Sequence, residues 1–184
     1  MADERPRISP LTEPDDEVAA FIERAGLRGP DGTALNIFGT LAHHPDLLRR
    51  WMVLAGHVMA KNSLSPRDRE ILILRIGVRC GSKYEFAQHA QIALNCDLSS
   101  DEVLATKGDV EHWPGTSHEQ TLLRAADELH DSQRLSDATW SSLTEVYTTQ
   151  QMLDLIFTCG QYTLVSMLLN SAQVEIDEGV PDLL

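Results

Sequence analysis

The sequence predicts an all-α protein, and three observations support this. Apolar residues recur every three or four positions along most of the chain, which is the spacing of a buried helix face. No segment shows the sustained alternation of apolar and polar residues that a half-buried strand requires. Ser65 followed by Pro66 is a typical helix start, because serine caps the first turn and proline suits its first position.

The first half of the chain is predicted to contain an arm and four helices. Residues 1–14 include three prolines and are expected to form an extended arm, because proline keeps the residue before it out of a helix. The fourth helix is apolar on nearly every side from 71 to 78, which indicates a central, buried helix. The expected helices are 15–25, before the Gly-Pro-Asp-Gly turn at 29–32, then 35–43, one capped by Asp46, and one capped by Ser65.

The second half is predicted to contain five more helices. Gly81 allows a break before the fifth helix, and Ser99-Ser100 opens the sixth. The expected helices are 82–95, 101–107, 119–131, one opened by Ser136, and about 149–174, with a loop at 108–117. Residues 15–178 are therefore predicted to form a single helical domain, followed by a loose tail at 179–184.

The composition indicates a small protein that stays in solution. Its 184 residues, 42% of them hydrophobic, are enough for one domain with its own core. The net charge of −13 argues against a nucleic-acid or anionic-membrane partner. Residues 155–169 are rich in apolar residues but fall short of the roughly 20 that a membrane span needs. We therefore expect a buried core helix there and no membrane segment.

The cysteines and the N-terminus favour a cytoplasmic location. Cys80, Cys96 and Cys159 are odd in number and widely spaced, which is not the pattern of a disulfide framework. The N-terminal residues lack the apolar stretch of a signal peptide. We therefore expect reduced thiols in the cytoplasm.

The strongest candidate for a chemical site lies in the helix predicted at 82–95. On a helical wheel Glu85 and His89 share a face with Phe86 and Ile92, and they lie one turn apart, so their side chains can meet. Burying a carboxylate on such a face without a partner is expensive. A carboxylate beside an imidazole fixes its tautomer and raises its basicity, so the pair is predicted to handle a proton.

Structural alternatives for these residues stay open at this point. Arg75, the one cation within the apolar run of the preceding helix, could neutralise Glu85 as a buried ion pair. His89 could be a core imidazole whose hydrogen bonds are satisfied. Glu70 shares a helical stripe with Ile73 and is either a third member of the site or a carboxylate favoured by the helix dipole.

No metal or cofactor is predicted. Glu85 and His89 could both bind a metal, but three ligands are usually needed and no second histidine pair stands nearby. The sequence also lacks a glycine-rich phosphate loop, a nucleophile elbow and a C-x-x-C. One further pattern predicts either a pocket wall or a seam between helices: polar residues four apart in the last helix, at Thr158, Tyr162, Ser166 and Asn170.

Several segments resemble the carboxymuconolactone decarboxylase family, a relative of the alkylhydroperoxidase D-like proteins. The resemblance covers roughly residues 34–178, and its core is the run RDREILILRIGVRCGSKYEFAQHAQIALNCDLSSDEV. The pieces LNIFGTLAHHPDLLRRW, LLRAADELHDSQRLSDATW and MLDLIFTCGQYTLVSMLLNSAQV are similar to the longer, often actinobacterial, members. The resemblance implies an alkylhydroperoxidase D-like helical bundle that assembles into a trimer or hexamer.

The resemblance also matches four positions of the family's site. In the peroxidase branch a glutamate precedes a C-x-x-C pair, and a histidine follows the second cysteine by four residues. Glu70 and His89 stand at the glutamate and histidine positions, while Ser82 and Glu85 stand at the two cysteine positions. Without these thiols the dithiol–disulfide cycle cannot operate. The decarboxylase branch, which acts on a carboxylated lactone through proton transfer, resembles this chain better in lacking the cysteine pair.

We therefore expect a cofactor-free acid–base enzyme that acts on a small lactone or carbonyl acid, by decarboxylation or proton transfer. His89 is the expected acid or base, Glu85 its partner and Glu70 an orienting group. The alternatives are an antioxidant peroxidase of the peroxiredoxin type, by family similarity, and a non-catalytic oligomeric binding protein. The candidate substrate-binding residues are Arg75, Ser82 and Tyr84, the last of which lies on the polar side of the helical wheel.

Overall fold

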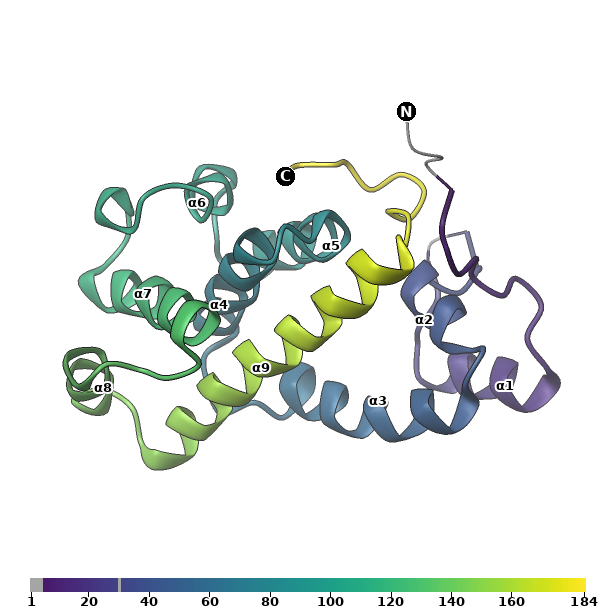
Figure 1. Ribbon diagram of the computed structural model, residues 1–184, viewed down its shortest axis with the longest axis horizontal. Helices are drawn as coiled ribbons and strands as arrows, with labels where there is room; N and C mark the ends of the chain where they lie inside the picture. The colour runs from purple at the N-terminus through teal and green to yellow at the C-terminus, as the bar shows by residue number, and fades with distance from the viewer. Residues whose placement is uncertain (1–4, 30) are drawn as a thin grey trace.

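A computed structural model describes residues 5–29 and 31–184 of the chain (Figure 1). Within these residues the secondary structure is helical, and the only bridge of β type joins Arg28 and Ala34. The prediction of an all-α fold is therefore confirmed. The helices are α1 (Asp16–Arg24), α2 (Asn36–Leu41), α3 (Pro45–Ala60), α4 (Pro66–Arg79), α5 (Lys83–Leu94), α6 (Ser100–Ala105), α7 (Ser117–Ser132), α8 (Asp137–Thr144) and α9 (Thr149–Ala172), with a short 3₁₀ helix at Val110–His112.

Helix α4 is the centre of the fold, as its apolar sequence predicts. It packs against α5, α7 and α9, and the side chains from Ile71 to Leu74 are fully buried. Helix α9 runs diagonally across the molecule, with α1 to α3 on one side of it and α4 to α8 on the other (Figure 1). Because α9 contacts both α3 and α5, side chains from these three helices can meet in one place.

Most of the predicted helix starts agree with the structure. The hydroxyl of Ser65 accepts a hydrogen bond from the Asp68 backbone N–H at 3.0 Å, and Pro66 is the first residue of α4. The start of α3 was predicted wrongly, because its capping residue is His44, whose side chain accepts from a first-turn N–H. Asp46 lies within that first turn but is not the cap. Its carboxylate is stabilised there by the helix dipole.

Helix α9 is long and apolar enough to cross a membrane if only length and composition are considered. In the folded protein, however, 56% of its most apolar 18-residue window is buried. The helix packs against α3, α4, α5, α7 and α8. This burial agrees with the core helix predicted from the sequence.

The two ends of the chain pack against the helices. Residues 1–4 of the predicted arm lie outside the described residues, but from Arg7 the arm is attached, and its backbone N–H donates to the carbonyl of Ala172 at 2.8 Å. The predicted loose tail at 179–184 is also held, because Lys83 forms an ion pair with Asp182 at 2.9 Å. Both ends therefore cover helices that line the site described next.

Candidate active site

A cavity of about 340 Å³ lies among α2, α3, α5 and α9. This volume is within the range of small-molecule sites. Its wall is largely apolar, with a few polar side chains that come mainly from α5 and α9. The apolar wall includes Ile37, Trp51, Met59, Ile92, Val165 and Leu169, and the polar residues are Tyr84, Glu85, Gln88, His89, Gln161 and Tyr162.

His89 is held by hydrogen bonds that link it to Glu70 and Glu70 to Arg69, behind the cavity wall. Its Nδ1 lies 2.7 Å from Oε2 of Glu70, a residue of α4 that is completely buried. The other oxygen of Glu70 accepts from the Arg69 guanidinium at 2.9 Å. Burial alone would raise the pKa of Glu70, but the charges and hydrogen bonds of His89 and Arg69 hold it below its usual value. Glu70 is therefore an anion at neutral pH.

This arrangement fixes how His89 can react. A carboxylate at Nδ1 keeps the ring proton on that nitrogen, so Nε2 carries the lone pair that can accept a proton. The ring of Tyr162 packs edge-on against the imidazole, with 4.7 Å between the ring centroids and 84° between their planes. His89 is thus oriented on two sides while it lines the cavity.

Glu85 lies on the same helix in a very different environment. Its side chain is almost fully buried, and its Oε2 accepts a hydrogen bond from Ser166 of α9 at 2.5 Å. Its Oε1 has no hydrogen-bond partner among the described residues. Burial raises the pKa of Glu85 well above its usual value, and the Ser166 bond offsets this only in part. Burial without a cation nearby therefore favours the neutral carboxylic acid form of Glu85, and one of its oxygens is unpaired.

The expected pairing of Glu85 with His89 needs correction. Both residues line the cavity, but the carboxylate that hydrogen-bonds His89 is Glu70. The alternative ion pair of Arg75 with Glu85 is also wrong, because the guanidinium of Arg75 binds both oxygens of Asp127 on α7 at 2.6 and 2.7 Å. The two carboxyl groups of the site thus differ in protonation state. Glu70 has the cation of Arg69 beside it, whereas Glu85 has no cation nearby.

Of the three predicted substrate-binding residues, only Tyr84 lines the cavity. Arg75 does not line the cavity, and two further N–H groups of its guanidinium donate to the backbone carbonyls of Thr106 and Gly108, so it is not placed to hold a substrate carboxylate there. Ser82 is fully buried at the start of α5 and does not line the cavity either. Tyr84 does line it, although the helical wheel put this residue on a polar face. Its hydroxyl is occupied, since it donates to Asp177 of the C-terminal segment at 2.5 Å.

Sequence reasoning missed three residues that complete the site. Arg69 neutralises Glu70, Ser166 binds Glu85, and Gln161 lines the cavity with its Oε1 unpaired among the described residues. Ser166 belongs to the polar stripe of the last helix, so that pattern carried a usable signal. Part of that stripe is indeed a pocket wall, because Tyr162 also faces the cavity.

The thiols of the chain lie outside the cavity wall, although Cys80 interacts with Ser166 and Glu85, and all three are poorly suited to act as nucleophiles. Cys80, Cys96 and Cys159 are all unpaired, and none lines the cavity. Burial raises the pKa of each thiol, that of Cys159 to about 12. Since the thiolate is the reactive form, these cysteines lack the lowered pKa of a catalytic thiol.

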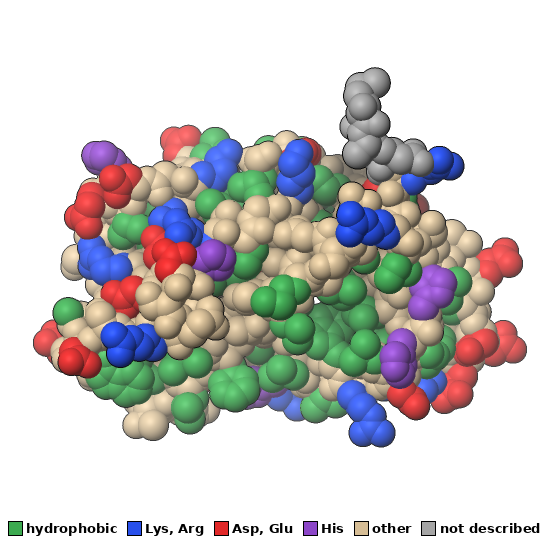
Figure 2. Space-filling model, in the orientation of Figure 1, with side chains coloured by type: hydrophobic (Ala, Val, Ile, Leu, Met, Phe, Trp, Pro, Cys, Tyr) green, Lys and Arg blue, Asp and Glu red, His purple; other side chains and the backbone are tan. Residues whose placement is uncertain are grey.

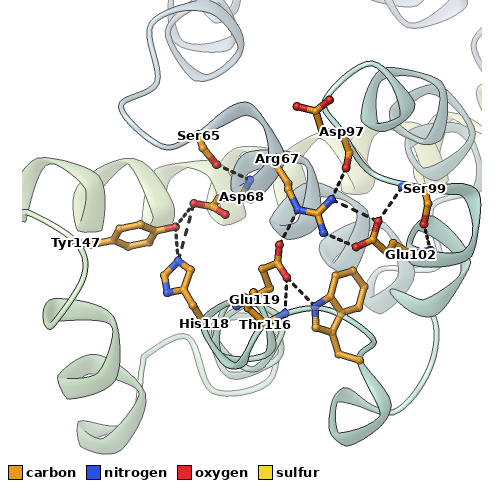
Figure 3. Close-up of polar contacts among 11 residues, drawn as sticks. Ser65, Arg67, Asp68, Asp97, Ser99, Glu102, Thr116, His118, Glu119 and Tyr147 are labelled. Carbon is orange, nitrogen blue, oxygen red and sulfur yellow. Dashed lines mark hydrogen bonds and ion pairs between the residues drawn. The ribbon is translucent and has the colours of Figure 1, made fainter.

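A second polar cluster joins the start of α4 to α6 and α7 (Figure 3). Arg67 lies between Glu119, at 2.6 Å, and Glu102, whose pKa its hydrogen bonds lower to about 2. Nearby, the Tyr147 hydroxyl donates to Asp68 at 2.7 Å. The donors and acceptors here are largely satisfied by each other, so this cluster holds helices together. Within the described residues there is no group of three or more His, Cys, Asp or Glu side chains placed to hold a metal ion.

A family model matches part of the chain, and the α2 and α9 residues that line the cavity lie outside that part. Residues 45–128, from α3 into α7, match the sequence model of the Carboxymuconolactone decarboxylase family. The family resemblance stated from the sequence is thereby confirmed over these residues. The matched region contains Glu70, Glu85 and His89. No curated protein matches the sequence.

Solved structures show where else this fold occurs. A peroxidase-related protein from Ralstonia eutropha JMP134, described as an alkylhydroperoxidase AhpD core, superposes with a TM-score of 0.78 at 18% identity, over 93% of each chain. A peroxidase-related protein from Silicibacter sp. TM1040 gives 0.82 at 13% identity, over 98% of this chain and 97% of that one. The debrominase Bmp8 in complex with 2,3,4-tribromopyrrole gives 0.75 at 16% identity, over 93% and 91%. These likenesses establish the alkylhydroperoxidase D-like fold.

Proposed function

From the premise that this chain is a carboxymuconolactone decarboxylase-like protein, matched to that family over residues 45–128, we propose that it is a cofactor-free acid–base enzyme. Its substrate is a small molecule with a lactone or other carbonyl group. One observation carries the proposal. The same cavity is lined by a histidine oriented by a carboxylate and by a carboxyl group that burial keeps protonated. A base with a free lone pair and an acid that carries a proton are what proton transfer to and from a carbonyl compound requires.

The proposed step moves two protons and no net electrons. Nε2 of His89 takes a proton from the carbon next to the substrate carbonyl, and Glu70 stabilises the resulting imidazolium. The electron pair of the broken C–H bond forms the C=C bond of an enol, while the carbonyl oxygen takes the proton of Glu85. When the enol O–H returns its proton to Glu85, His89 can deliver its own proton to the same carbon or to another. Exchange with solvent results when the imidazolium swaps its proton with water before delivery, and delivery to another carbon gives an isomer.

Proton transfer fits the cavity better than decarboxylation does. A decarboxylation substrate brings its own carboxylate, which a buried site has to neutralise. No Lys or Arg side chain of the described residues lines the cavity, and Arg75 is already paired with Asp127. The peroxidase alternative receives no support from the thiols, because burial raises the pKa of all three.

The test is deuterium incorporation from D₂O. The protein is incubated with a panel of small neutral ketones and lactones, and loss of the proton signal next to the carbonyl is followed by NMR. We expect protein-dependent exchange with at least one member of the panel, without any added metal or cofactor. Absence of exchange for every compound that binds in the cavity would overturn the proposal.

The thiols are expected to be dispensable for this reaction. We predict that replacing Cys80, Cys96 and Cys159 together by alanine leaves the exchange rate per folded molecule largely unchanged, because none of them lines the cavity. Circular dichroism checks that the variant is folded. Rapid hydroperoxide reduction by the wild type, lost on Cys80→Ala alone, would instead favour the peroxidase. Three unpaired thiols also suit the reducing cytoplasm, which we propose as the location.

We also propose that the protein is a homo-oligomer, a trimer or hexamer as the family resemblance implies. Four apolar side chains follow one another along α9, each more than half exposed. We call Leu153, Phe157, Leu164 and Met167 the α9 stripe. Hydrophobic side chains are visible along this helix on the face shown in Figure 2. Their spacing of four, seven and three residues puts them on one face of the helix, and exposed apolar patches of this kind usually mark interfaces.

Charges in the α9 stripe are expected to break the assembly. The double substitution Phe157→Glu and Leu164→Glu should reduce the mass in solution to that of a monomer, because a buried carboxylate at each contact lacks a partner. The mass is measured by light scattering at micromolar concentration. Leu104→Glu, on the exposed side of α6, is the matched control and should leave the mass unchanged. A monomeric wild type would refute the proposal.

A further inference from the structure

The contacts around His89 form a closed ring that passes through four helices. Nδ1 of His89 on α5 lies 2.7 Å from Glu70 on α4, and Glu70 accepts from the guanidinium of Arg69. Another nitrogen of that guanidinium donates to the backbone carbonyl of Met59 on α3 at 2.8 Å. The ring closes through Tyr162 of α9, whose hydroxyl lies 2.9 Å from the sulfur of Met59 and whose aromatic ring packs against the imidazole. Arg69 therefore joins Glu70 to the part of the cavity wall that Met59 and Tyr162 form.

The guanidinium of Arg69 suits this position because its donors point in different directions. Nε and Nη2 lie 2.9 and 2.8 Å from one oxygen of Glu70, while Nη1 donates to Met59. Met59 belongs to the last turn of α3, where backbone carbonyls lack a partner within the helix, and arginine side chains often bind such carbonyls. Arg69 is itself buried, so these contacts fix its position.

Arg69 also balances the charge of the buried pair formed by Glu70 and His89. Glu70 is completely buried and His89 is 8% exposed, so a net charge on the pair would be poorly solvated. With Arg69 present, one cation and one anion balance, and the imidazole can stay neutral. Among the described residues no lysine and no second arginine lies within ion-pair distance of Glu70. The neutral state of the imidazole therefore depends on a single side chain.

The other titratable groups around the pair do not supply a cation. The phenol of Tyr162 on α9 and the thiol of Cys96, just after α5, both interact with the Glu70 carboxylate. Burial and that carboxylate raise the pKa of both groups, so both are uncharged at neutral pH. On α5 itself the nearest carboxyl group is that of Glu85, which burial keeps protonated. From α3 the contact is a backbone carbonyl, so none of these groups can replace Arg69.

We propose that Arg69 is a positioning residue for His89, which keeps Nε2 of the imidazole free of a proton at neutral pH and holds the ring at the cavity wall. The inference rests on the proposed function in taking Nε2 as the base, and it adds a residue that does not line the cavity.

The removal of Arg69 would change where the protons of the pair lie. The buried pair of Glu70 and His89 would then carry a net negative charge, and it would bind one additional proton. That proton blocks Nε2 in both of the arrangements open to it. Either the imidazole becomes an imidazolium beside a carboxylate, or Glu70 becomes a carboxylic acid that donates to Nδ1, which moves the ring proton to Nε2.

The test locates the protons of the imidazole directly. Side-chain nitrogen NMR of the intact, isotope-labelled protein distinguishes a protonated ring nitrogen from one with a lone pair, and the variant His89→Gln identifies the signals of His89. In the wild type at pH 7 we expect a proton on Nδ1 and a lone pair on Nε2. In Arg69→Met, which removes the charge and keeps an unbranched side chain, we expect a proton on Nε2. Arg69→Lys keeps a cation and should restore the wild-type signals.

Two further variants separate the charge of Arg69 from other effects of the substitution. Arg69→Gln is also neutral, but its amide can still donate a hydrogen bond to Glu70, so it provides a second uncharged variant if Arg69→Met does not fold. It should also have a proton on Nε2. Arg79→Met removes a guanidinium from the same helix, one that pairs with Asp131 near the surface, and should leave the His89 signals unchanged. Thermal melts check that each variant is folded.

Deuterium exchange gives an independent measure of the same effect. At pH 7 Arg69→Met should exchange at least about tenfold more slowly than the wild type, because the base is blocked by a proton. The rate should recover when the pH is raised by about 1–3 pH units, the range over which a neighbouring charge acts on a titrating group. The affinity for the same compound, measured by calorimetry, should change much less. A loss of rate at every pH, with unchanged His89 signals, would mean that Arg69 is only structural.

The outcomes separate this inference from the proposed function. A proton on Nε2 in the wild type at pH 7 would overturn the role of Arg69, and this measurement needs no variant. Uncharged variants whose His89 signals match those of the wild type would also overturn it, even if the wild type exchanges protons of a ketone or lactone. The expected signals, with no deuterium exchange in any ketone or lactone, would support the role of Arg69 and overturn the enzyme proposal.

Discussion

Replacing Glu70 by glutamine is expected to lower the free energy of unfolding by about 3–5 kcal/mol at neutral pH. Glu70 is fully buried and accepts from two donors, Arg69 and His89. Glutamine offers a single acceptor oxygen, so one donor loses its partner, and the guanidinium of Arg69 is left without a counter-charge in a poorly solvated position. The change is measured by urea denaturation followed by circular dichroism.

The pH dependence identifies the charge as the cause. The pKa of Glu70 is lowered in the folded protein, so its contribution is present above the unfolded pKa of about 4.5 and is lost as the pH falls through the folded value. The difference between wild type and Glu70→Gln should therefore be large at pH 7 and shrink in acid. An equal loss of stability at both pH values would mean that shape, rather than charge, holds His89.

Glu85→Gln is the matched control, and its effect should have the opposite sign. The pKa of Glu85 is raised in the folded protein, so the wild type loses stability as the pH rises from about 4.5 towards that raised value. Glutamine keeps the shape and cannot ionise. The variant should match the wild type near pH 4.5 and be more stable at pH 7. A marked loss of stability at pH 7 would show that Glu85 has a charged partner.

Replacing His89 by glutamine is expected to slow deuterium exchange of a bound ketone or lactone by about 10²–10⁴-fold, the usual contribution of a general base. Glutamine can still donate a hydrogen bond to Glu70, so the buried carboxylate keeps a partner and the fold is expected to survive. Exchange is followed by NMR, and the dissociation constant of the same compound is measured in parallel. The loss should appear in the rate, with affinity changed much less.

The double variant shows whether the two cavity groups serve one step. If His89 removes the proton while Glu85 protonates the carbonyl oxygen, then adding Glu85→Gln to His89→Gln should slow the exchange little further. Fully multiplicative losses would mean that the two residues act in separate steps. An exchange rate unaffected by His89→Gln would assign the reaction to another base.

Local patterns in the sequence were sufficient to predict the helices and several of the residues that line the cavity. The apolar run from Ile71 to Val78 predicted the central helix, and the serine caps predicted where several helices start. The spacing of Glu85 and His89 placed both on a buried side of one helix, and both line the cavity. These features depend on residues within about one turn of each other, which the helical repeat relates directly.

The partners of those residues could not be read from the same patterns. Glu70 reaches His89 from 19 positions away, Asp127 reaches Arg75 from 52, and Ser166 reaches Glu85 from 81. Each contact depends on how α4 packs against α5, α7 and α9, which the spacing along one helix does not specify. Arg69 is the chain neighbour of Glu70, but packing brought His89 to Glu70 and left Glu85 without a cation. For that physical reason Glu70 and Glu85, which both lie on buried helix faces, differ in charge in the folded protein.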